Sequence, residues 1–177
     1  MKIAVYLASK SGNDPVYTEA VAELGHWIGS NHHDLVYGGS QIGLMGTLAD
    51  AVKESGGKIF GVGVKVAKIQ KVVHKDLDEH VEAETIQERK EIMMEKADAF
   101  ITIPGSLGTL DEVTDIMAAS KLGLSQKPCL IYNIKGYYDP LIAMLDNMVA
   151  EGFLSKSDIS NVLFVKNLGE ILDILCD

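Results

Sequence analysis

The chain contains 177 residues, of which 47% are hydrophobic, and it carries a formal net charge of −9. This length predicts one domain that spans residues 1–177, and the acidic balance argues against bulk electrostatic binding to nucleic acid or an anionic membrane surface. No apolar run is long enough to span a bilayer, and neither Cys129 nor Cys176 has the spacing of a metal ligand. We therefore expect a cytoplasmic protein.

Apolar runs typical of strands alternate along the chain with segments of helical period. The first strand covers 3–7, and Asp14 and Pro15 then start a helix as its cap and first residue, with an apolar stripe that runs to Ile28. The later elements are expected as strand 34–37, helix 42–54, strand 58–64, helix 85–96, strand 98–103, helix 109–122, strand 127–132, helix 138–150, strand 162–165 and helix 169–175. This alternation predicts an α/β fold with a doubly wound, mostly parallel sheet and helices on both faces.

The segment 65–84 is the least regular part of the chain. Lysines dominate its first half and acidic residues its second half. We expect a surface connection with one short strand near Val81. Two interpretations stay open: a solvated charged face, which is the more frequent role of such a segment, and a lid over a ligand site.

Two glycine-rich turns, at 38–46 and 104–108, each join an expected strand to an expected helix. Neither is a dinucleotide fingerprint or a P-loop, because the G-x-G-x-x-G spacing and the G-K-[ST] ending are missing. Glycine lets backbone N–H groups approach a ligand, and a helix N-terminus favours an anion, most often a phosphate. Both turns lie at the C-terminal edges of parallel strands, so they are predicted to face one crevice near the point where the strand order reverses.

Glu112 follows the second turn and has two interpretations. Thr109 and Glu112 have the spacing of a capping box, in which the Glu112 carboxylate would bond back to the N–H of Thr109. Alternatively, the carboxylate is free to act on a ligand beside the phosphate cradle. A phosphate cradle beside an acidic side chain indicates an enzyme that acts on a phosphorylated small molecule.

Arg89 lies on the expected buried stripe of its helix, between Ile86 and Met93. Since burying an unpaired charge is costly, we expect Arg89 to have either an internal ion-pair partner or an anionic ligand. Its neighbour Lys90 is predicted to face solvent. The histidines show neither a metal-binding nor a triad spacing, and no G-x-S-x-G motif is present, so no metal, cofactor or serine nucleophile is expected.

These residues resemble the motifs of the Lonely Guy proteins, a family long labelled possible lysine decarboxylases. The family signature P-G-G-x-G-T-x-x-E is similar to residues 104–112, with Ser106 in place of the second glycine. A second motif, roughly M-H-x-R-K, aligns with residues 86–90, and the turn at 37–46 resembles V-Y-G-G-G-x-x-G-L-M-G. The resemblance extends in order over nearly the whole chain.

The resemblance implies a Rossmann-like homodimer that hydrolyses the N-glycosidic bond of nucleoside 5′-monophosphates of the AMP or cytokinin riboside monophosphate type. The products would be the free base and ribose 5-phosphate, in cytokinin biosynthesis. By the same resemblance, Glu112 and Arg89 form the catalytic pair, and no cofactor is needed. The residues implied to bind the substrate are Gly39, Ser40, Lys90, Gly105, Ser106, Gly108 and Thr109.

Departures from the family pattern keep a second function open. Gln87 and Ile86 replace the usual histidine and methionine, and Ser106 adds a side chain at the phosphate turn. The alternative is therefore a protein of the same fold that binds or senses a nucleotide without hydrolysing it. Lysine decarboxylation is rejected, because such chemistry normally needs a pyridoxal-type cofactor on a Schiff-base lysine and the sequence has no motif for one.

Overall fold

The computed structural model describes residues 1–65 and 72–176. Its centre is a seven-stranded sheet in the order β4-β3-β2-β1-β5-β6-β7, in which every neighbouring pair is parallel. The strands are β1 (Lys2–Tyr6), β2 (Asp34–Tyr37), β3 (Lys58–Val64), β4 (Glu79–Ala83), β5 (Ala99–Thr102), β6 (Cys129–Tyr132) and β7 (Val162–Val165). The predicted α/β, doubly wound sheet is confirmed, and it is wholly rather than mostly parallel.

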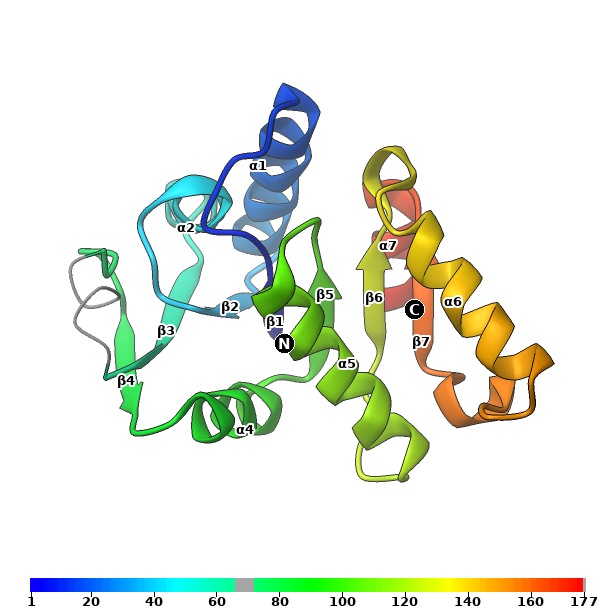
Figure 1. Ribbon diagram of the computed structural model, residues 1–177. Helices are drawn as coiled ribbons and strands as arrows, with labels where there is room; N and C mark the ends of the chain where they lie inside the picture. The colour runs from blue at the N-terminus through cyan, green and yellow to red at the C-terminus, as the bar shows by residue number, and fades with distance from the viewer. Residues whose placement is uncertain (66–71, 177) are drawn as a thin grey trace.

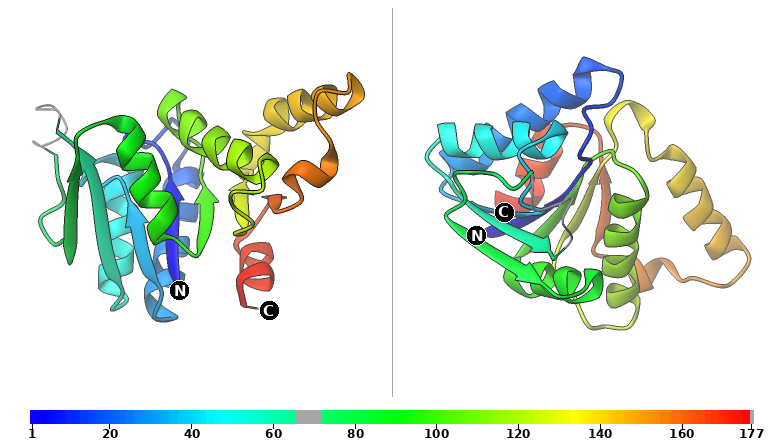
Figure 2. Two further views of the ribbon diagram at one scale, coloured as in Figure 1. Left: turned by 90° about the horizontal axis from the view of Figure 1, so that it is seen from below. Right: turned by 60° about the vertical axis from the view of Figure 1, so that its left-hand side comes forward.

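Helices cover both faces of the sheet (Figures 1 and 2). On one face lie α1 (Pro15–Ser30), α2 (Gly43–Glu54) and α7 (Leu168–Cys176), and on the other lie α4 (Ile86–Lys96), α5 (Leu107–Lys121) and α6 (Asp139–Ala150), with short 3₁₀ turns η1 (Ile134–Gly136) and η2 (Lys156–Ile159). Alternate residues of each strand enter the two cores: Ile3 and Val5 face α1, whereas Ala4 and Tyr6 face α4 and α5. In the described residues, every helix is too short or too polar to cross a lipid bilayer.

The predicted start of α1 is confirmed. The Asp14 side chain accepts a hydrogen bond of 3.0 Å from the N–H of Val16, and Pro15 occupies the first turn. At α4 half of the expected capping box forms: Thr85 accepts from the N–H of Glu88 at 3.1 Å. The Glu88 carboxylate instead accepts from the N–H of Glu84, one residue before the cap.

Two expectations about the helices are wrong, one about where α5 begins and one about the burial of Ile86. Helix α5 begins at Leu107 rather than at 109, so Thr109 lies inside the helix and cannot cap it. Ile86 is 60% exposed instead of buried. The reason is its position at the N-terminus of α4, where the helix extends over a cavity at the carboxyl edge of the sheet rather than over the strands.

The connection expected at 65–84 does contain a strand, because β4 spans Val81 and pairs with β3. The part of the proposed lid at 66–71 lies outside the described residues. The segment after residue 71 is not a purely solvated face, since His74 is buried. These elements place the turns after β1, β2, β3 and β5 along one edge of the sheet.

Candidate active site

A cavity of about 460 Å³ opens at the carboxyl edge of the sheet, between the turn after β2 and the start of α5. Gly38 and Ser40 line one side, and Gly108 and Glu112 line the other. The expectation that the two glycine-rich turns face one crevice is therefore confirmed. Apolar side chains complete the wall, namely Ile42, Met45, Val64, Val72 and Ile86.

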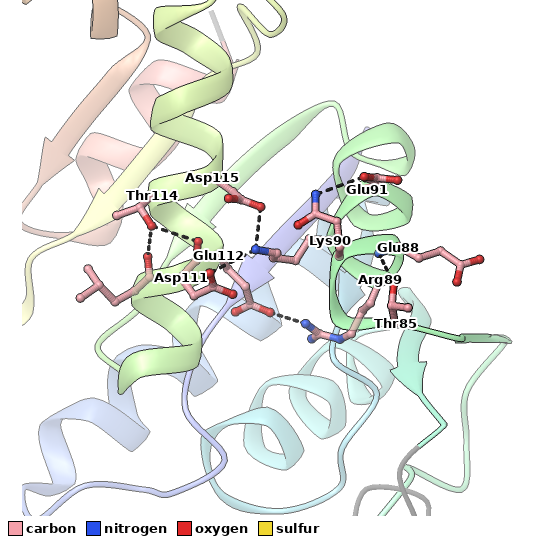
Figure 3. Close-up of polar contacts among 11 residues, drawn as sticks. Thr85, Glu88, Arg89, Lys90, Glu91, Asp111, Glu112, Thr114 and Asp115 are labelled. Carbon is pink, nitrogen blue, oxygen red and sulfur yellow. Dashed lines mark hydrogen bonds and ion pairs between the residues drawn. The ribbon is translucent and has the colours of Figure 1, made fainter.

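The Glu112 carboxylate is buried at this cavity and is bound to Arg89. The Nη1 of Arg89 donates to Glu112 Oε1 at 2.6 Å, and the Arg89 Nε donates to the carbonyl of Val62 at 2.8 Å. Figure 3 shows Arg89 extending from α4 toward Glu112 on α5. The capping interpretation of Glu112 is wrong, because its carboxylate bonds across to another helix and not back to Thr109. Arg89 has the internal partner that its position on the helix required.

Burial governs the ionisation of Glu112. Removal from water raises the pKa of its carboxyl above the ordinary value, and the charge and hydrogen bond of Arg89 oppose this rise without cancelling it. A raised pKa in a cavity is typical of a carboxyl group that exchanges protons with a ligand. The Arg89 cation therefore makes the ionised form of Glu112 less costly to keep at the cavity.

Gly38 leaves room for this arrangement. A Cβ atom at Gly38 would come within 2.9 Å of Arg89 Nη2 and 3.2 Å of the Met45 sulfur. The glycine after β2 therefore lets the guanidinium lie against the backbone of the turn. Gly39, with φ of 77°, makes the tight bend that comes next and packs against Gly61 of β3, so it shapes the turn rather than lining the cavity.

Lys90 was predicted to face solvent, and this is wrong: it is only 7% exposed. Its Nζ lies 3.1 Å from Asp111 Oδ1 and 2.8 Å from Asp115 Oδ2, both on α5 (Figure 3). Burial lowers the pKa of Lys90, but the hydrogen bonds from its ammonium to the two carboxylates outweigh burial and leave the pKa above its ordinary value. Lys90 thus fastens α4 to α5 beside the cavity.

Replacing Lys90 by Met keeps the aliphatic stem and removes the ammonium, and we expect it to lower the free energy of unfolding by about 1–3 kcal/mol. The matched control is Lys96→Met on the same helix, where the ion pair to Glu79 is more exposed. The control should cost no more than about 1 kcal/mol. Urea unfolding curves measure both changes, and equal losses would contradict the special role of Lys90.

The remaining expected residues lie in two groups. Ser40 and Gly108 line the cavity that holds Glu112, whereas Gly105 and Ser106 line a second cavity beside it. Thr109 is buried, and its hydroxyl lies where a Cβ at Gly105 would be, so only glycine fits at that position of the turn.

Gly108 has open space where its Cβ would be. Gly108→Ala should therefore leave folding intact and even stabilise α5 by about 0.5–1 kcal/mol. Because Gly108 lines the cavity that holds Glu112, an added methyl group would take up space there, and we expect the KM for a ligand of that cavity to rise. Thermal unfolding and steady-state kinetics measure the two effects. Gly105→Ala is the contrasting variant, since it must displace Thr109 and should destabilise the protein.

Sequence reasoning missed two features of the site. His74 is buried and bonds to Asp50 at 3.0 Å, while its backbone N–H donates to the carbonyl of Gly39 at 2.8 Å, so it ties the segment after 71 to the turn after β2. The loop after β1 was also missed: Ser9 lines both cavities. No local pattern marks either contact, because each joins segments far apart in sequence. In the described part of the chain, no group of three histidine, cysteine or acidic side chains is arranged to hold a metal ion.

The parallel sheet, the glycine-rich turns and the ion-paired carboxylate at its carboxyl edge define a Rossmann-like α/β protein with a ligand site at that edge. The profile of the family described as "Possible lysine decarboxylase" matches residues 45–175. Cytokinin riboside 5'-monophosphate phosphoribohydrolase LOG2 of Arabidopsis thaliana is 34% identical over 174 residues, which cover 98% of this chain and 82% of that protein. The chain belongs to this family, the Lonely Guy proteins, as its motifs suggested.

Further relatives agree with this assignment. The probable cytokinin riboside 5'-monophosphate phosphoribohydrolase LOGL9 of Oryza sativa subsp. japonica is 39% identical over 156 residues, covering 88% of this chain and 69% of that protein. Among solved structures, the molybdenum cofactor binding protein from Rippkaea orientalis aligns with a TM-score of 0.73 and 21% identity, covering 99% of this chain and 94% of that one. The molybdenum cofactor carrier protein from Chlamydomonas reinhardtii aligns with a TM-score of 0.74 and 18% identity, covering 99% and 95%. At such identities the structural likeness establishes the fold alone.

Proposed function

We propose that this protein hydrolyses the N-glycosidic bond of a nucleoside 5′-monophosphate, of the AMP or cytokinin riboside monophosphate type, to the free base and ribose 5-phosphate. The observation that carries the proposal is the buried Glu112 carboxylate, bound by Arg89 at 2.6 Å and placed at a cavity between two glycine-rich turns. The curated relatives that match this chain are named for this activity.

The chemistry requires a negative charge beside the sugar. As the C1′–N bond breaks, positive charge develops on the ribose ring, and a water molecule supplies the oxygen of the new C1′–O bond. A carboxylate can stabilise that charge and accept the proton of the attacking water. One oxygen of Glu112 is held by Arg89, and its other oxygen has no hydrogen-bond partner among the described residues. We assign this second oxygen to the reacting sugar.

The other residues of the site are proposed to bind and position the substrate. The turn through Gly105 and Ser106 and the first turn of α5 at Gly108 and Thr109 present backbone N–H groups to the phosphate, and remote binding of this kind orients the sugar. Ser40 lines the opposite side of the cavity, and Gly39 shapes the turn that carries it. Lys90, in this proposal, acts indirectly: it holds α4, and hence Arg89, against α5.

Incubation with AMP and with a cytokinin riboside monophosphate, followed by chromatography of the free base, tests the proposal. Base release from at least one nucleotide is expected. The competing function, nucleotide binding without turnover, predicts that calorimetry detects an intact nucleotide while no base is released even at protein concentrations near those of the nucleotide. Lysine decarboxylation is not proposed, because Lys90, the buried lysine of the site, is held between two carboxylates.

We also propose that the protein is a cytoplasmic homodimer. Exposed apolar side chains on and around α5 and α6 support an interface: Leu107, Leu110, Leu122, Leu124, Met144 and Phe153. Helix α6 buries none of its residues, and Figure 2 shows it extending away from the sheet. Both cysteines are free thiols, which suits a reducing compartment. Light scattering after size-exclusion chromatography should give twice the chain mass of 19.2 kDa, and the single mass would contradict the dimer.

A further inference from the structure

A second cavity, of about 250 Å³, lies where the strand order of the sheet reverses. After β1 the chain turns to α1 on one face, and after the neighbouring strand β5 it turns to α5 on the other face. Such a point leaves a crevice between the two loops, where open parallel sheets bind their ligands. The residues with polar side chains that line this crevice are Ser9, Lys10, Ser11, Tyr17, Ser106 and Tyr137.

The second cavity adjoins the one that holds Glu112. Ser9 lines both cavities, and the turn at Gly105 and Ser106 leads directly into the helix that carries Gly108 and Glu112. Tyr137 braces this turn, since its hydroxyl donates to the carbonyl of Gly105. A ligand with its sugar beside Glu112 can therefore extend its 5′ end over Ser9 into the second cavity.

The two cavities differ in whether their cationic side chains are free to bind an anion. Arg89 is bound to Glu112 and to the carbonyl of Val62, and Lys90 is bound to Asp111 and Asp115. Lys10 is exposed, and in the described part of the chain it forms no ion pair. Backbone N–H groups can hold a phosphate, and a cation that is not already neutralised strengthens its binding by a charge-assisted hydrogen bond. Lys10 meets this condition among the residues that line the two cavities.

The proposed function already assigns the 5′-phosphate of the substrate to the turn through Gly105 and Ser106. We propose that Lys10, which lines the cavity beside that turn, is the residue that recognises the charge of this phosphate. The serine hydroxyls of the cavity add neutral donors, and the amides at the start of α5 lie on the side toward Glu112. This inference rests on the proposed function, because it identifies the phosphorylated end of the same substrate. Lys10 thereby sets the preference for a nucleotide over a nucleoside.

Calorimetry with AMP and adenosine tests the role of Lys10 in a Glu112→Gln background, where ligands bind without turnover. Lys10→Gln should weaken AMP binding by about 10- to 100-fold, the usual effect of losing a charge-assisted hydrogen bond. Adenosine binding should not change. The control is Lys58→Gln, which removes the same charge from an exposed lysine at the opposite edge of the sheet, where β3 begins, and should leave both affinities unchanged. Since Lys10 is exposed, both variants are expected to melt at the parental temperature.

The outcomes separate this inference from the proposed function. AMP binding that depends on Lys10 but yields no free base from the protein with Glu112 intact would support the inference and overturn the hydrolase. If AMP is hydrolysed and Lys10→Gln leaves the affinity for AMP unchanged, the hydrolase is supported and the role of Lys10 is overturned. An equal loss of AMP and adenosine binding would overturn the phosphate role of Lys10, and absence of AMP binding at millimolar concentration would overturn both proposals.

Discussion

Glu112→Gln is expected to lower kcat/KM for AMP hydrolysis by about 10³-fold, because an amide cannot carry the negative charge that the reacting sugar needs. Nucleotide affinity should change far less, since the amide has nearly the same shape. Replacing the carboxylate leaves Arg89 without its charged partner, so the free energy of unfolding should fall by about 1–3 kcal/mol. Base release under single-turnover conditions gives the rate, and urea unfolding gives the stability.

The matched control for Glu112→Gln is Asp111→Asn. Asp111 precedes Glu112 on α5 and lines the same cavity, but its carboxylate binds Lys90 and is half exposed. The control removes the same charge from the neighbouring position and should lower kcat/KM less than about tenfold, because Asp115 still pairs with Lys90 and the Arg89–Glu112 pair stays intact. Equal losses in the two variants would show that the field of the acidic cluster, and not the Glu112 carboxylate, supports the reaction.

Arg89→Met should have the second large effect, on stability and on pH dependence together. It leaves a buried carboxylate without its cation, which costs about 3–5 kcal/mol at neutral pH. Burial already raises the pKa of Glu112 and Arg89 opposes the rise, so losing Arg89 raises that pKa further. The acid limb of the kcat/KM profile, where activity falls as Glu112 gains a proton, should therefore move to higher pH. Arg89→Lys should restore part of the shift.

The same variant gives a stability test with a definite sign. Between the ordinary pKa of a glutamate and the raised pKa of Glu112, the folded protein holds more protons than the unfolded chain, so stability decreases as pH rises through this window. Arg89→Met should thus regain stability on acidification from pH 7. Combining it with Glu112→Gln should abolish this dependence. A Met variant whose stability is flat with pH while Glu112 is present would contradict the burial of an ionised carboxylate.

Local patterns in the sequence were sufficient for the elements but not for all of their contacts. Apolar runs placed the strands within about two residues, and the Asp14–Pro15 start of α1 was confirmed, because both depend on neighbours in sequence. The predicted start of α5 was wrong, although it too was read from local spacing. Thr109 and Glu112 have the spacing of a capping box, yet the helix already begins at Leu107. The true partner of the Glu112 carboxylate is Arg89, which lies 23 residues away in the sequence. No local pattern in the sequence indicates such a contact.

The helix α4 shows what helical spacing leaves undetermined. Spacing gives the angle of a residue around the helix axis, but not its distance along the sheet or the identity of the facing helix. Ile86 lies at a suitable angle but is exposed, because it is the first residue of α4 and lines the cavity, whereas Lys90 is buried beside two carboxylates of α5. Arg89 was correctly predicted to need a partner, since burial cost alone decides that question. The identity of its partner, Glu112, could be seen only in the folded structure.

The proposed hydrolysis depends on a Glu112 carboxylate that lies beside the C1′–N bond of a nucleotide whose phosphate is held at the start of α5. A crystal structure of the Glu112→Gln protein soaked with AMP would reveal both positions at once. We expect the side chain at position 112 to lie about 3–3.5 Å from the ribose C1′. The phosphate should lie in the cavity between the loops that follow β1 and β5. AMP bound with its glycosidic bond away from position 112, or with its phosphate on Arg89, would be incompatible with this mechanism.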